Sequence, residues 1–262
     1  MDVPRVAIVT GAAQGIGRHT AEVLGQAGYV LVLADLQPCD AVVANVQAFG
    51  AQAIAITGDL TDDTVIAAIV EAARATYGRI DVLVNNAGIS SIQHAEVVAR
   101  STFERVVAIN LVAPFLLSQA CFPLMRAQGQ GSIINIASIA GLFGIADRVA
   151  YNASKHGLIG MTRTLAAEWG ALGIRCNAIC PGWVKTEMDA ADQSSGAYTD
   201  EDITARVPMG RFATPADIAQ GIVYLADPAR SGFINGHALV IDGGWTADAS
   251  WDALRLAHRD AP

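Results

Sequence analysis

The stretch RVAIVTGAAQGIG, residues 5–17, joins an apolar run to a cluster of glycines. Residues 5–10 are apolar and rich in β-branched side chains, which predicts a buried strand. Gly11, Gly15 and Gly17 follow at once and open a helical segment. Glycines let a backbone approach a pyrophosphate closely, and the N-terminus of a helix favours negative charge. The stretch therefore predicts a dinucleotide site in the first strand-to-helix turn, although glycines also serve in tight turns that bind nothing.

Six later runs resemble the first strand, at residues 30–35, 52–59, 81–86, 131–138, 174–180 and 237–242. Several are apolar almost throughout, which is typical of strands covered on both faces. The segments between them, such as 17–28 and 62–78, are rich in alanine and helix-forming residues. This β-α-β order predicts an α/β fold, a Rossmann-type doubly wound parallel sheet of seven strands with helices on both faces.

The chain shows no sign of a second domain, because no linker rich in proline or glycine divides residues 1–262. Residues 187–212 are polar, acidic and interrupted by glycine, which predicts a substrate lid or a disordered insert within the single domain. Residues 246–262 form a tail that we expect to contain at most one short helix, with Trp251 and Leu254 on its apolar side.

The composition limits the possible partners. Apolar residues make up 52% of the chain and charged residues 16%, which indicates extensive burial that includes subunit interfaces. The net charge is −8 and no basic run occurs, so we expect no binding to nucleic acid. Residues 106–125 carry no charge, but they include Asn110, Pro114 and Pro123. We interpret them as a helix buried between the sheet and a partner subunit, not as a membrane span.

The four cysteines lack a histidine nearby, and Cys176 and Cys180 have a poor spacing for metal ligands. We therefore expect no metal site and interpret all four as reduced thiols of a cytoplasmic protein. The N-terminus runs directly into the first strand, and it shows no pattern of a signal peptide.

Asp35 ends the second predicted strand, where a carboxylate can accept hydrogen bonds from the adenosine ribose. The same carboxylate would repel a 2′-phosphate, and Gln14, Leu36 and Gln37 supply no compensating base. An N-cap role for Asp35 is the structural alternative. The pattern favours NAD as the cofactor over NADP.

Tyr151 and Lys155, in AYNASKHG, would share one face of a helix because they lie four residues apart. A nearby ammonium favours the phenolate, so we expect Lys155 to lower the tyrosine pKa from about 10. Such a pair can exchange protons near neutral pH, although an exposed Tyr and Lys without a function have the same spacing.

Taken in order, these pieces resemble the short branch of the short-chain dehydrogenase/reductase family over nearly the whole chain. The matching motifs are T-G-x-x-x-G-x-G at residues 10–17, Asp59 in GDLTD, N-N-A-G at 85–88, Asn110, Ser138 in NIASIAG, Tyr151 with Lys155, and P-G-x-V-x-T at 181–186. None of these positions departs from the family pattern.

The resemblance implies four catalytic residues. Tyr151 is expected to give or take the proton of the substrate oxygen, while Lys155 lowers its pKa and holds the nicotinamide ribose. Ser138 is expected to hydrogen-bond the substrate oxygen, and Asn110 to hold a water that relays protons from Lys155. The cofactor contacts implied are Gly11, Gln14, Gly15, Ile16, Gly17, Asp35, Asp59, Leu60, Asn86, Ala87, Gly88, Tyr151, Lys155, Pro181, Gly182, Val184 and Thr186.

The substrate is less determined. His94, Arg148 and Trp183 lie near the expected mouth of the site and are candidates for substrate contacts. We predict an NAD-dependent oxidoreductase for a secondary alcohol or ketone, preferably a small polar alcohol, polyol or sugar. A 3-oxoacyl-thioester reductase is the alternative, and a non-catalytic NAD-binding sensor is a remote one. The family commonly forms tetramers, and we expect a homotetramer here.

Overall fold

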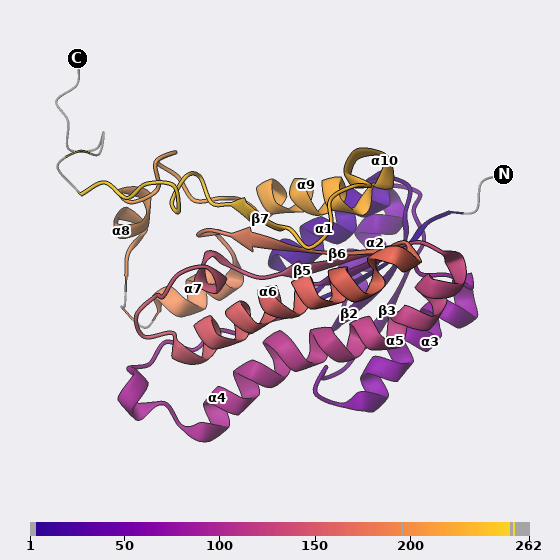
Figure 1. The fold of residues 1–262 in the computed structure, drawn as a ribbon, viewed down its shortest axis with the longest axis horizontal. Coiled ribbons are helices and arrows are strands. Elements are labelled where there is room, and N and C mark those ends of the chain that lie inside the picture. The colour runs from indigo at the N-terminus through magenta and orange to yellow at the C-terminus, as the bar shows by residue number, and fades with distance from the viewer. Residues whose placement is uncertain (1–3, 195, 197, 252–253, 255–262) are drawn as a thin grey trace, which may run out of the picture.

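The core of the molecule is a sheet of seven parallel strands in the order β3-β2-β1-β4-β5-β6-β7 (Figure 1). The computed structural model describes residues 4–194, 196, 198–251 and 254. The strands are β1 (Val6–Thr10), β2 (Val30–Asp35), β3 (Ala53–Thr57), β4 (Val82–Asn85), β5 (Gly131–Ile136), β6 (Ile174–Pro181) and β7 (Ala238–Ile241). All seven predicted strands are present, with ends that differ by two residues at most, so the predicted fold class is confirmed.

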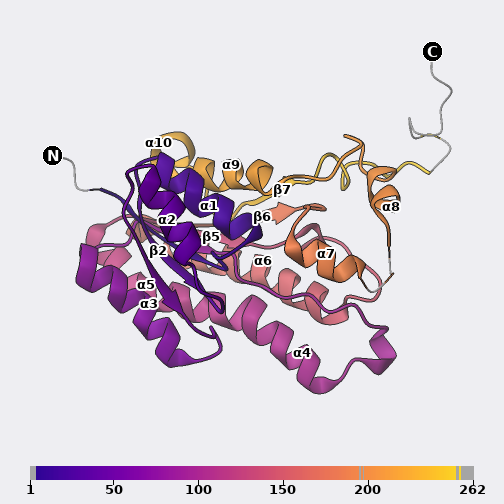
Figure 2. The same cartoon turned by 180° about the vertical axis from the view of Figure 1, so that it is seen from behind.

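Helices cover both faces of the sheet, as Figure 1 and the view from behind in Figure 2 show. One face carries α1 (Gly15–Gln26), α2 (Asp40–Ala48) and α9 (Pro215–Ala226). The other face carries α3 (Asp63–Tyr77), α5 (Ala113–Gln128) and α6 (Val149–Trp169). The remaining helical elements are η1 (Ala95–Val97), α4 (Arg100–Val107), η2 (Ala108–Val112), η3 (Ile139–Gly141), η4 (Gly170–Leu172), α7 (Glu187–Gln193), α8 (Asp200–Thr204) and α10 (Pro228–Ser231).

The central strands are apolar throughout because their side chains pack into a hydrophobic core on each face of the sheet. In β1, Ala7 and Val9 pack toward α1 and α9, whereas Val6 and Ile8 pack toward α3 and α5. All four side chains are fully buried. Burial of apolar surface on both faces is the dominant stabilising contribution to such a sheet.

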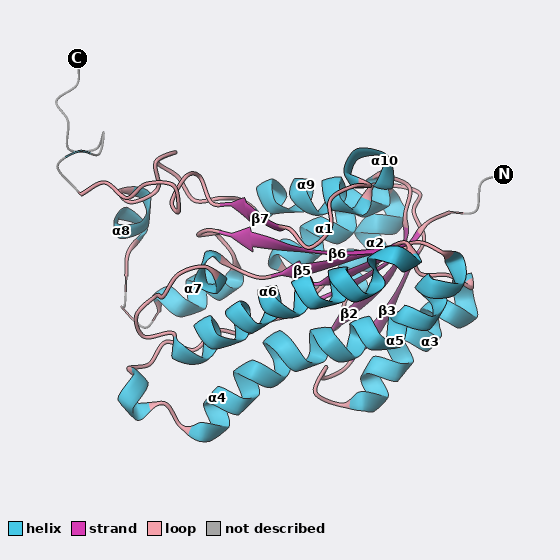
Figure 3. Ribbon diagram, in the orientation of Figure 1, coloured by secondary structure: helices cyan, strands magenta, loops and turns pink. Residues whose placement is uncertain are grey.

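The strand order reverses between β1 and β4. From β1 the chain adds β2 and β3 toward one edge of the sheet, and from β4 it adds β5, β6 and β7 toward the other edge. In open parallel sheets, the loops diverge at this reversal and leave a crevice at the carboxyl ends of the strands. Figure 3 shows the arrowheads of β6 and β7 pointing toward the side on which α7 and α8 lie. The carboxyl edge of the sheet is therefore the place to examine for a site.

Residues 106–125 lie within one continuous helical stretch, residues 100–128, as their composition predicts. They cover the end of α4, the π-helical turn η2 and most of α5. Residues 100–128 are long and apolar enough to cross a membrane by length and composition alone, and almost half of the tested window is buried inside the molecule. A core helix of a non-membrane protein passes the same test, and the packing of Leu117, Cys121 and Met125 against the sheet favours that interpretation.

Residues 187–212 contain the two short helices α7 and α8, in the place where a lid was predicted. The predicted helix of the tail lies largely outside the described residues. Within the described part, the side chains of Trp251 and Leu254 are exposed. The four cysteines are free thiols and buried, as expected.

Candidate active site

A cavity of about 380 Å³ opens at the carboxyl edge of the sheet, at the reversal between β1 and β4. The glycine turn and Asp35 form one end of its wall, and Ser138, Tyr151 and the α7 segment form the other. Most of the predicted site residues line it. The predicted residues on the wall are Gly11, Gln14, Gly15, Ile16, Asp35, Asp59, Leu60, Asn86, Ala87, Gly88, Ser138, Arg148, Tyr151, Lys155, Pro181, Gly182, Trp183, Val184 and Thr186.

The glycine turn between β1 and α1 is packed too closely for other residues. Gly11 and Gly15 have φ values of 63° and 52°, in the left-handed region that favours glycine. A Cβ on Gly17 would lie 1.9 Å from the carbonyl oxygen of Gly11, so Gly17 supports the turn from beneath without lining the cavity. Gln14, the N-cap of α1, makes no side-chain hydrogen bond to the first turn. The N–H groups there therefore lack a side-chain cap, which suits an anionic ligand such as a pyrophosphate.

Thr10 and Asn86 join the ends of β1 and β4 beneath that turn. The Nδ2 of Asn86 donates to the carbonyl oxygens of Thr10 and Gly11 at 2.9 and 3.1 Å. The Oγ1 of Thr10 accepts from the backbone N–H groups of Asn86 and Ala87, both at 3.1 Å. The side chain of Asn86 thus fixes the backbone of the glycine turn, in addition to the cofactor contact that the family implies.

Asp35 is held rigidly at the end of β2. Its Oδ2 accepts a hydrogen bond from the backbone N–H of Ala13 at 2.9 Å, and its Oδ1 accepts one from Gln37 at 2.9 Å. The N-cap of the following helix α2 is Cys39, so the alternative N-cap role for Asp35 is wrong. The carboxylate is a fixed negative charge on the cavity wall.

Asp59 pairs with Arg105, a residue that the sequence analysis did not identify. The Nη2 of Arg105 lies 2.7 Å from Oδ2 of Asp59, and both residues line the cavity. The hydrogen bonds from Thr61 and Arg105 lower the pKa of Asp59. Arg105 lies on α4, 46 residues after Asp59, and no motif in the sequence indicates this ion pair.

Ser138, Tyr151 and Lys155 meet at the other end of the cavity. Ser138 follows β5 and caps η3, where its Oγ accepts from the N–H of Ala140 at 3.1 Å. Tyr151 and Lys155 lie one turn apart on α6, as the spacing predicted, with Nζ of Lys155 at 5.6 Å from the centre of the tyrosine ring. Lys155 is buried, and its Nζ donates to the carbonyl oxygen of Ile136 at 2.7 Å.

The expected lowering of the Tyr151 pKa by Lys155 is wrong for this structure. Burial is the largest effect and raises the pKa of Tyr151, whereas a hydrogen bond with Ser138 and the charge of Arg148 lower it by less. Burial also lowers the pKa of Lys155 to about 8, because an ammonium loses its hydration there. The spacing argument considered only the attraction between the two groups and omitted the cost of removing water from both.

Asn110 lies behind the cavity wall, fully buried, in the π-helical turn η2. Its Oδ1 accepts from the backbone N–H of Ile89 at 2.9 Å, and its Nδ2 donates to the carbonyl oxygen of Ile89 and to Oγ of Ser154. A Cβ on Gly88 would lie 3.2 Å from Asn110 Oδ1 and 3.5 Å from Lys155 Nζ. The structure therefore brings Asn110 close to Lys155, and the water relay between them stays a prediction.

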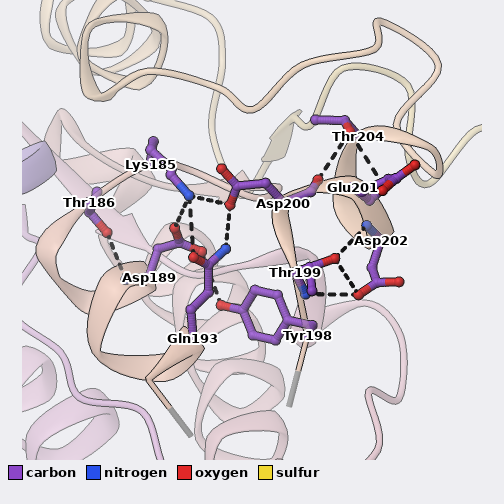
Figure 4. Close-up of polar contacts among 10 residues, drawn as sticks. All are labelled: Lys185, Thr186, Asp189, Gln193, Tyr198, Thr199, Asp200, Glu201, Asp202 and Thr204. Carbon is purple, nitrogen blue, oxygen red and sulfur yellow. Dashed lines mark hydrogen bonds and ion pairs between the residues drawn. The ribbon is translucent and has the colours of Figure 1, made fainter. Parts of the chain in front are cut away.

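The α7–α8 segment is held by the polar contacts drawn in Figure 4. Lys185 contacts Asp189 at 3.1 Å and also pairs with Asp200. The hydroxyl of Tyr198 donates to Oδ1 of Asp189 at 3.0 Å. The ring of Tyr198 packs against that of Trp183, with 5.0 Å between their centres. These contacts place Trp183, Tyr198 and Asp189 together on the cavity wall.

The three candidate substrate residues differ in position. Trp183 and Arg148 line the cavity, and Arg148 is buried. His94 does not line it: its ring is exposed, and Nδ1 lies 2.8 Å from Oδ1 of Asp147. Tyr198 and Asp192 are wall residues that the sequence analysis included only within the lid. In the described part of the chain, no group of three or more His, Cys, Asp or Glu side chains is arranged to hold a metal ion.

The chain is similar to known proteins over most of its length. The profile of the family described as enoyl-(acyl carrier protein) reductase matches residues 11–246. The chain is 39% identical over 246 residues to D-threitol dehydrogenase of Mycolicibacterium smegmatis, which covers 92% of this chain and 93% of the relative. It is 38% identical to cis-4-hydroxycyclohexanecarboxylate dehydrogenase of Sinomonas cyclohexanicum, over 93% of this chain and 97% of the relative.

Two further matches bear on the acyl-thioester alternative and on the cofactor. The chain is 35% identical to the 3-oxoacyl-[acyl-carrier-protein] reductase FabG of Thermotoga maritima, over 92% of this chain and 97% of the relative. A crystal structure described as an NAD(P)-dependent gluconate 5-dehydrogenase of Beutenbergia cavernae, with bound NADP at low occupancy, is 39% identical with a TM-score of 0.88. That likeness covers 93% of this chain and 97% of the solved chain.

Proposed function

The chain belongs to the short-chain dehydrogenase/reductase family, and we propose that it is an NAD-dependent dehydrogenase of a small uncharged polar alcohol, polyol or sugar. Its relatives are oxidoreductases that act on CH–OH groups. The observation that carries the proposal is the convergence of Ser138, Tyr151 and Lys155 on one end of a cavity whose other end is a glycine turn and a fixed carboxylate.

The cavity fits a nicotinamide dinucleotide. The first turn of α1 has no side-chain cap, so its N–H groups suit a pyrophosphate. Asp35 can accept hydrogen bonds from ribose hydroxyls, and its charge disfavours a 2′-phosphate at that position. Arg105, which also lines the cavity, is already paired with Asp59. These contacts support NAD over NADP in this chain, in contrast to the NADP described for the solved relative.

We assign the catalytic groups as follows. A bound nicotinamide supplies the hydride acceptor for oxidation and the donor for reduction. Tyr151 gives its phenolic proton to the substrate oxygen in reduction and removes that proton in oxidation. Ser138 hydrogen-bonds the same oxygen through Oγ and stabilises the charge that develops on it. Lys155 would hold the ribose of a bound cofactor through Nζ, and Asn110 fixes the backbone of Ile89.

The substrate class follows from the charges and rings near Tyr151. The carboxylate of Asp189 is paired with Lys185, and that of Asp192 is paired with Arg148. Trp183 and Tyr198 add aromatic surface with polar edges. Near Tyr151, the described wall thus combines paired carboxylates with aromatic rings that carry polar edges, which suits an uncharged hydroxylated molecule.

A 3-oxoacyl-thioester reductase is the second candidate, because the matching family profile and the relative from Thermotoga maritima both carry acyl carrier protein activities in their descriptions. The acidic residues of the α7–α8 segment argue against a polyanionic carrier at this mouth. A non-catalytic NAD sensor is the remote alternative. Such a protein has no need for Ser138, Tyr151 and Lys155 together.

The deciding experiment measures NADH formation at 340 nm across a panel of polyols, sugars and cyclic alcohols, with NAD and NADP compared. The proposal expects oxidation of at least one uncharged alcohol with NAD preferred. Activity confined to 3-oxoacyl thioesters with NADPH would establish the second candidate. NAD binding without turnover of any alcohol, ketone or thioester would favour the sensor.

We also propose that the chain acts as a homotetramer in the cytoplasm. The α5 and α6 layer exposes Val112, Phe115 and Val149, each about two-fifths accessible, which supports contact with a second copy. The four free, buried thiols support a reducing compartment.

A further inference from the structure

Arg148 occupies the N-cap position of α6, one turn before Tyr151, and is only 8% exposed. Its Nη1 donates to Oδ2 of Asp192 at 2.8 Å and to Oγ of Ser90 at 2.7 Å. Its guanidinium carbon lies 5.6 Å from the centre of the Trp183 ring. Arg148, Asp192 and Trp183 all line the cavity. The guanidinium therefore lies on the substrate side of the site, with a carboxylate from α7 already bound to it.

The other cationic side chains on the cavity wall are bound to other partners. Among the described residues that line the cavity, the cationic side chains are Arg105, Arg148 and Lys155. Arg105 pairs with Asp59 on the opposite side of the cavity from Tyr151. Lys155 is buried beneath Tyr151 and donates to a backbone carbonyl. Arg148 is thus the guanidinium that a negatively charged group on a substrate would meet near Tyr151.

We propose that the carboxylate of Asp192 binds the guanidinium of Arg148 in the place that a substrate carboxylate would otherwise take. The pair therefore makes the site select uncharged alcohols over hydroxy acids. The inference rests on the proposed oxidation of alcohols and adds the residue pair that determines the substrate charge. A buried guanidinium requires a partner anion, and a carboxylate is the planar partner that fits it. While Asp192 is paired with Arg148, the Asp192 carboxylate offsets the positive charge of the guanidinium and its oxygens repel a substrate carboxylate. Without Asp192, the same guanidinium becomes a subsite for a carboxylate.

The test compares Asp192→Ser with the wild type on two matched pairs of probes. The pairs are threitol with threonate, and 4-methylcyclohexanol with 4-hydroxycyclohexanecarboxylate, each differing by a carboxylate. We expect the wild type to prefer the uncharged member, and Asp192→Ser to shift the ratio of kcat/KM toward the acid by roughly tenfold or more. Glu201→Ser is the control, because it removes an exposed carboxylate of α8 in the same segment. It should leave the ratio unchanged.

Two further variants distinguish an effect of the Arg148 guanidinium from an effect of removing a negative charge from the α7–α8 segment. Asp192→Asn keeps the side-chain shape and should shift the ratio in the same direction, which covers the case in which the serine variant folds poorly. The double variant Arg148→Met with Asp192→Ser should not show the shift of the kcat/KM ratio toward the acid, because no cation remains to bind the substrate carboxylate. A gain that persists in the double variant would overturn the proposal.

A binding measurement that needs no turnover completes the test. Sodium acetate, compared with sodium chloride at equal ionic strength, should raise the unfolding temperature of Asp192→Ser but not that of the wild type or the double variant. If the wild type oxidises none of the probes while acetate stabilises Asp192→Ser, the proposed alcohol substrate fails and the Arg148 subsite stands. If the wild type prefers the acid, or if Asp192→Ser gains neither acid turnover nor acetate binding, the inference is overturned.

Discussion

Tyr151 holds its proton firmly because burial raises its pKa above the ordinary value of 10. Oxidation of an alcohol requires the phenolate as base, whereas reduction of a ketone requires the phenol as acid. We therefore expect kcat for oxidation to increase as the pH rises from about 7 to about 10, and kcat for reduction to stay nearly constant over that range and to fall only at higher pH. Initial rates in both directions across a buffer series measure this. Oxidation that is fastest near neutral pH would contradict the assignment.

The matching variant is Tyr151→Phe, which removes the proton and keeps the ring. General acid–base catalysis contributes about 10²–10⁴-fold, so we expect kcat to fall by that order at every pH. The dissociation constant for NADH, measured by fluorescence titration, should change little, because the hydroxyl is one contact among many along the cavity. A variant with near-normal rates would exclude Tyr151 as the proton donor.

Lys155 is retained at a cost in stability. Its pKa of about 8 in the folded chain lies below the ordinary 10.5, so the unfolded chain binds more protons between those values. Below about pH 8 the native state bears the full cost of a buried ammonium, and stability rises as the pH increases toward about 10.5. Lys155→Met removes the ammonium together with its hydrogen bond to Ile136. We expect the variant to be more stable than the wild type by about 1–2 kcal/mol at pH 7, with a difference that shrinks above pH 8.

Urea unfolding of both proteins at pH 7 and pH 9.5 measures that difference. When one free energy of unfolding is subtracted from the other, the contributions of groups that titrate in both proteins cancel. Activity and NADH affinity should fall in the same variant, because Nζ holds the ribose in the proposed mechanism. Unchanged NADH affinity would remove Lys155 from the cofactor site. A variant less stable at pH 7 than the wild type would show that the hydrogen bond to Ile136 outweighs the burial cost.

Asp35 is expected to set the choice of cofactor. Its two oxygens are fixed by the N–H groups of Ala13 and Gln37, so the carboxylate cannot turn away from a 2′-phosphate. We expect kcat/KM with NAD to exceed that with NADP by about 10²-fold or more. Replacing Asp35 by Ser and Leu36 by Arg should reverse the preference by removing repulsion and adding a phosphate partner. A wild type that prefers NADP would refute the cofactor assignment.

At the scale of an element, the α7–α8 segment is held over the cavity by a small number of polar contacts. Tyr198→Phe removes the hydroxyl that donates to Asp189 and keeps the ring against Trp183. We expect KM for the alcohol to rise by about 3–10-fold, in line with one lost hydrogen bond to a charged group, while kcat and NAD affinity change little. Steady-state kinetics measure both.

Tyr77→Phe is the matched control for that variant. Tyr77 ends α3 and packs against the core, and α3 lies at the opposite end of the molecule from α7 and α8 (Figure 1), so loss of its hydroxyl should leave KM unaltered. If the two variants behave alike, the hydroxyl of Tyr198 has no special role in the lid. If kcat falls and KM does not change, the lid acts on chemistry and not on substrate binding.

At the scale of the whole molecule, apolar side chains on the α5 and α6 layer remain accessible, among them Val112 and Phe115. Figure 1 shows these helices side by side on one face of the sheet. We expect light scattering to give a mass near four times that of the 27.3 kDa chain. Phe115→Arg should lower the mass, because a charge enters the apolar contact. A single-chain mass for the wild type at micromolar concentration would contradict the assembly.

Phe49→Arg is the control for that substitution. Phe49 is the C-cap of α2, on the opposite face of the sheet, and is similarly exposed. It should leave the mass unchanged. A drop in mass for both variants would point to a general effect of added charge, and a drop for Phe49→Arg alone would move the contact to the α1 and α2 layer.

The sequence by itself determined the layers of the molecule and the place of its site. Strands such as residues 30–35 are apolar on both faces, and this local property predicts a covered parallel sheet before any contact is known. The glycine turn and the Tyr151–Lys155 spacing are short-range patterns as well. Their positions follow from chain geometry within a few residues, so the predictions for the turn and for the shared helix face did not depend on the rest of the fold.

Only the tertiary structure decided which distant residues meet and what their environment does to their charges. The pairs Arg105–Asp59 and Arg148–Asp192 join segments far apart in sequence, and no local pattern encodes either. The pKa of Tyr151 changed direction from the prediction because desolvation depends on everything packed around the phenol. Local periodicity reports which face of an element is buried. The balance between burial and charge is a property of the whole packed site, and it decides the direction in which the pKa of Tyr151 moves.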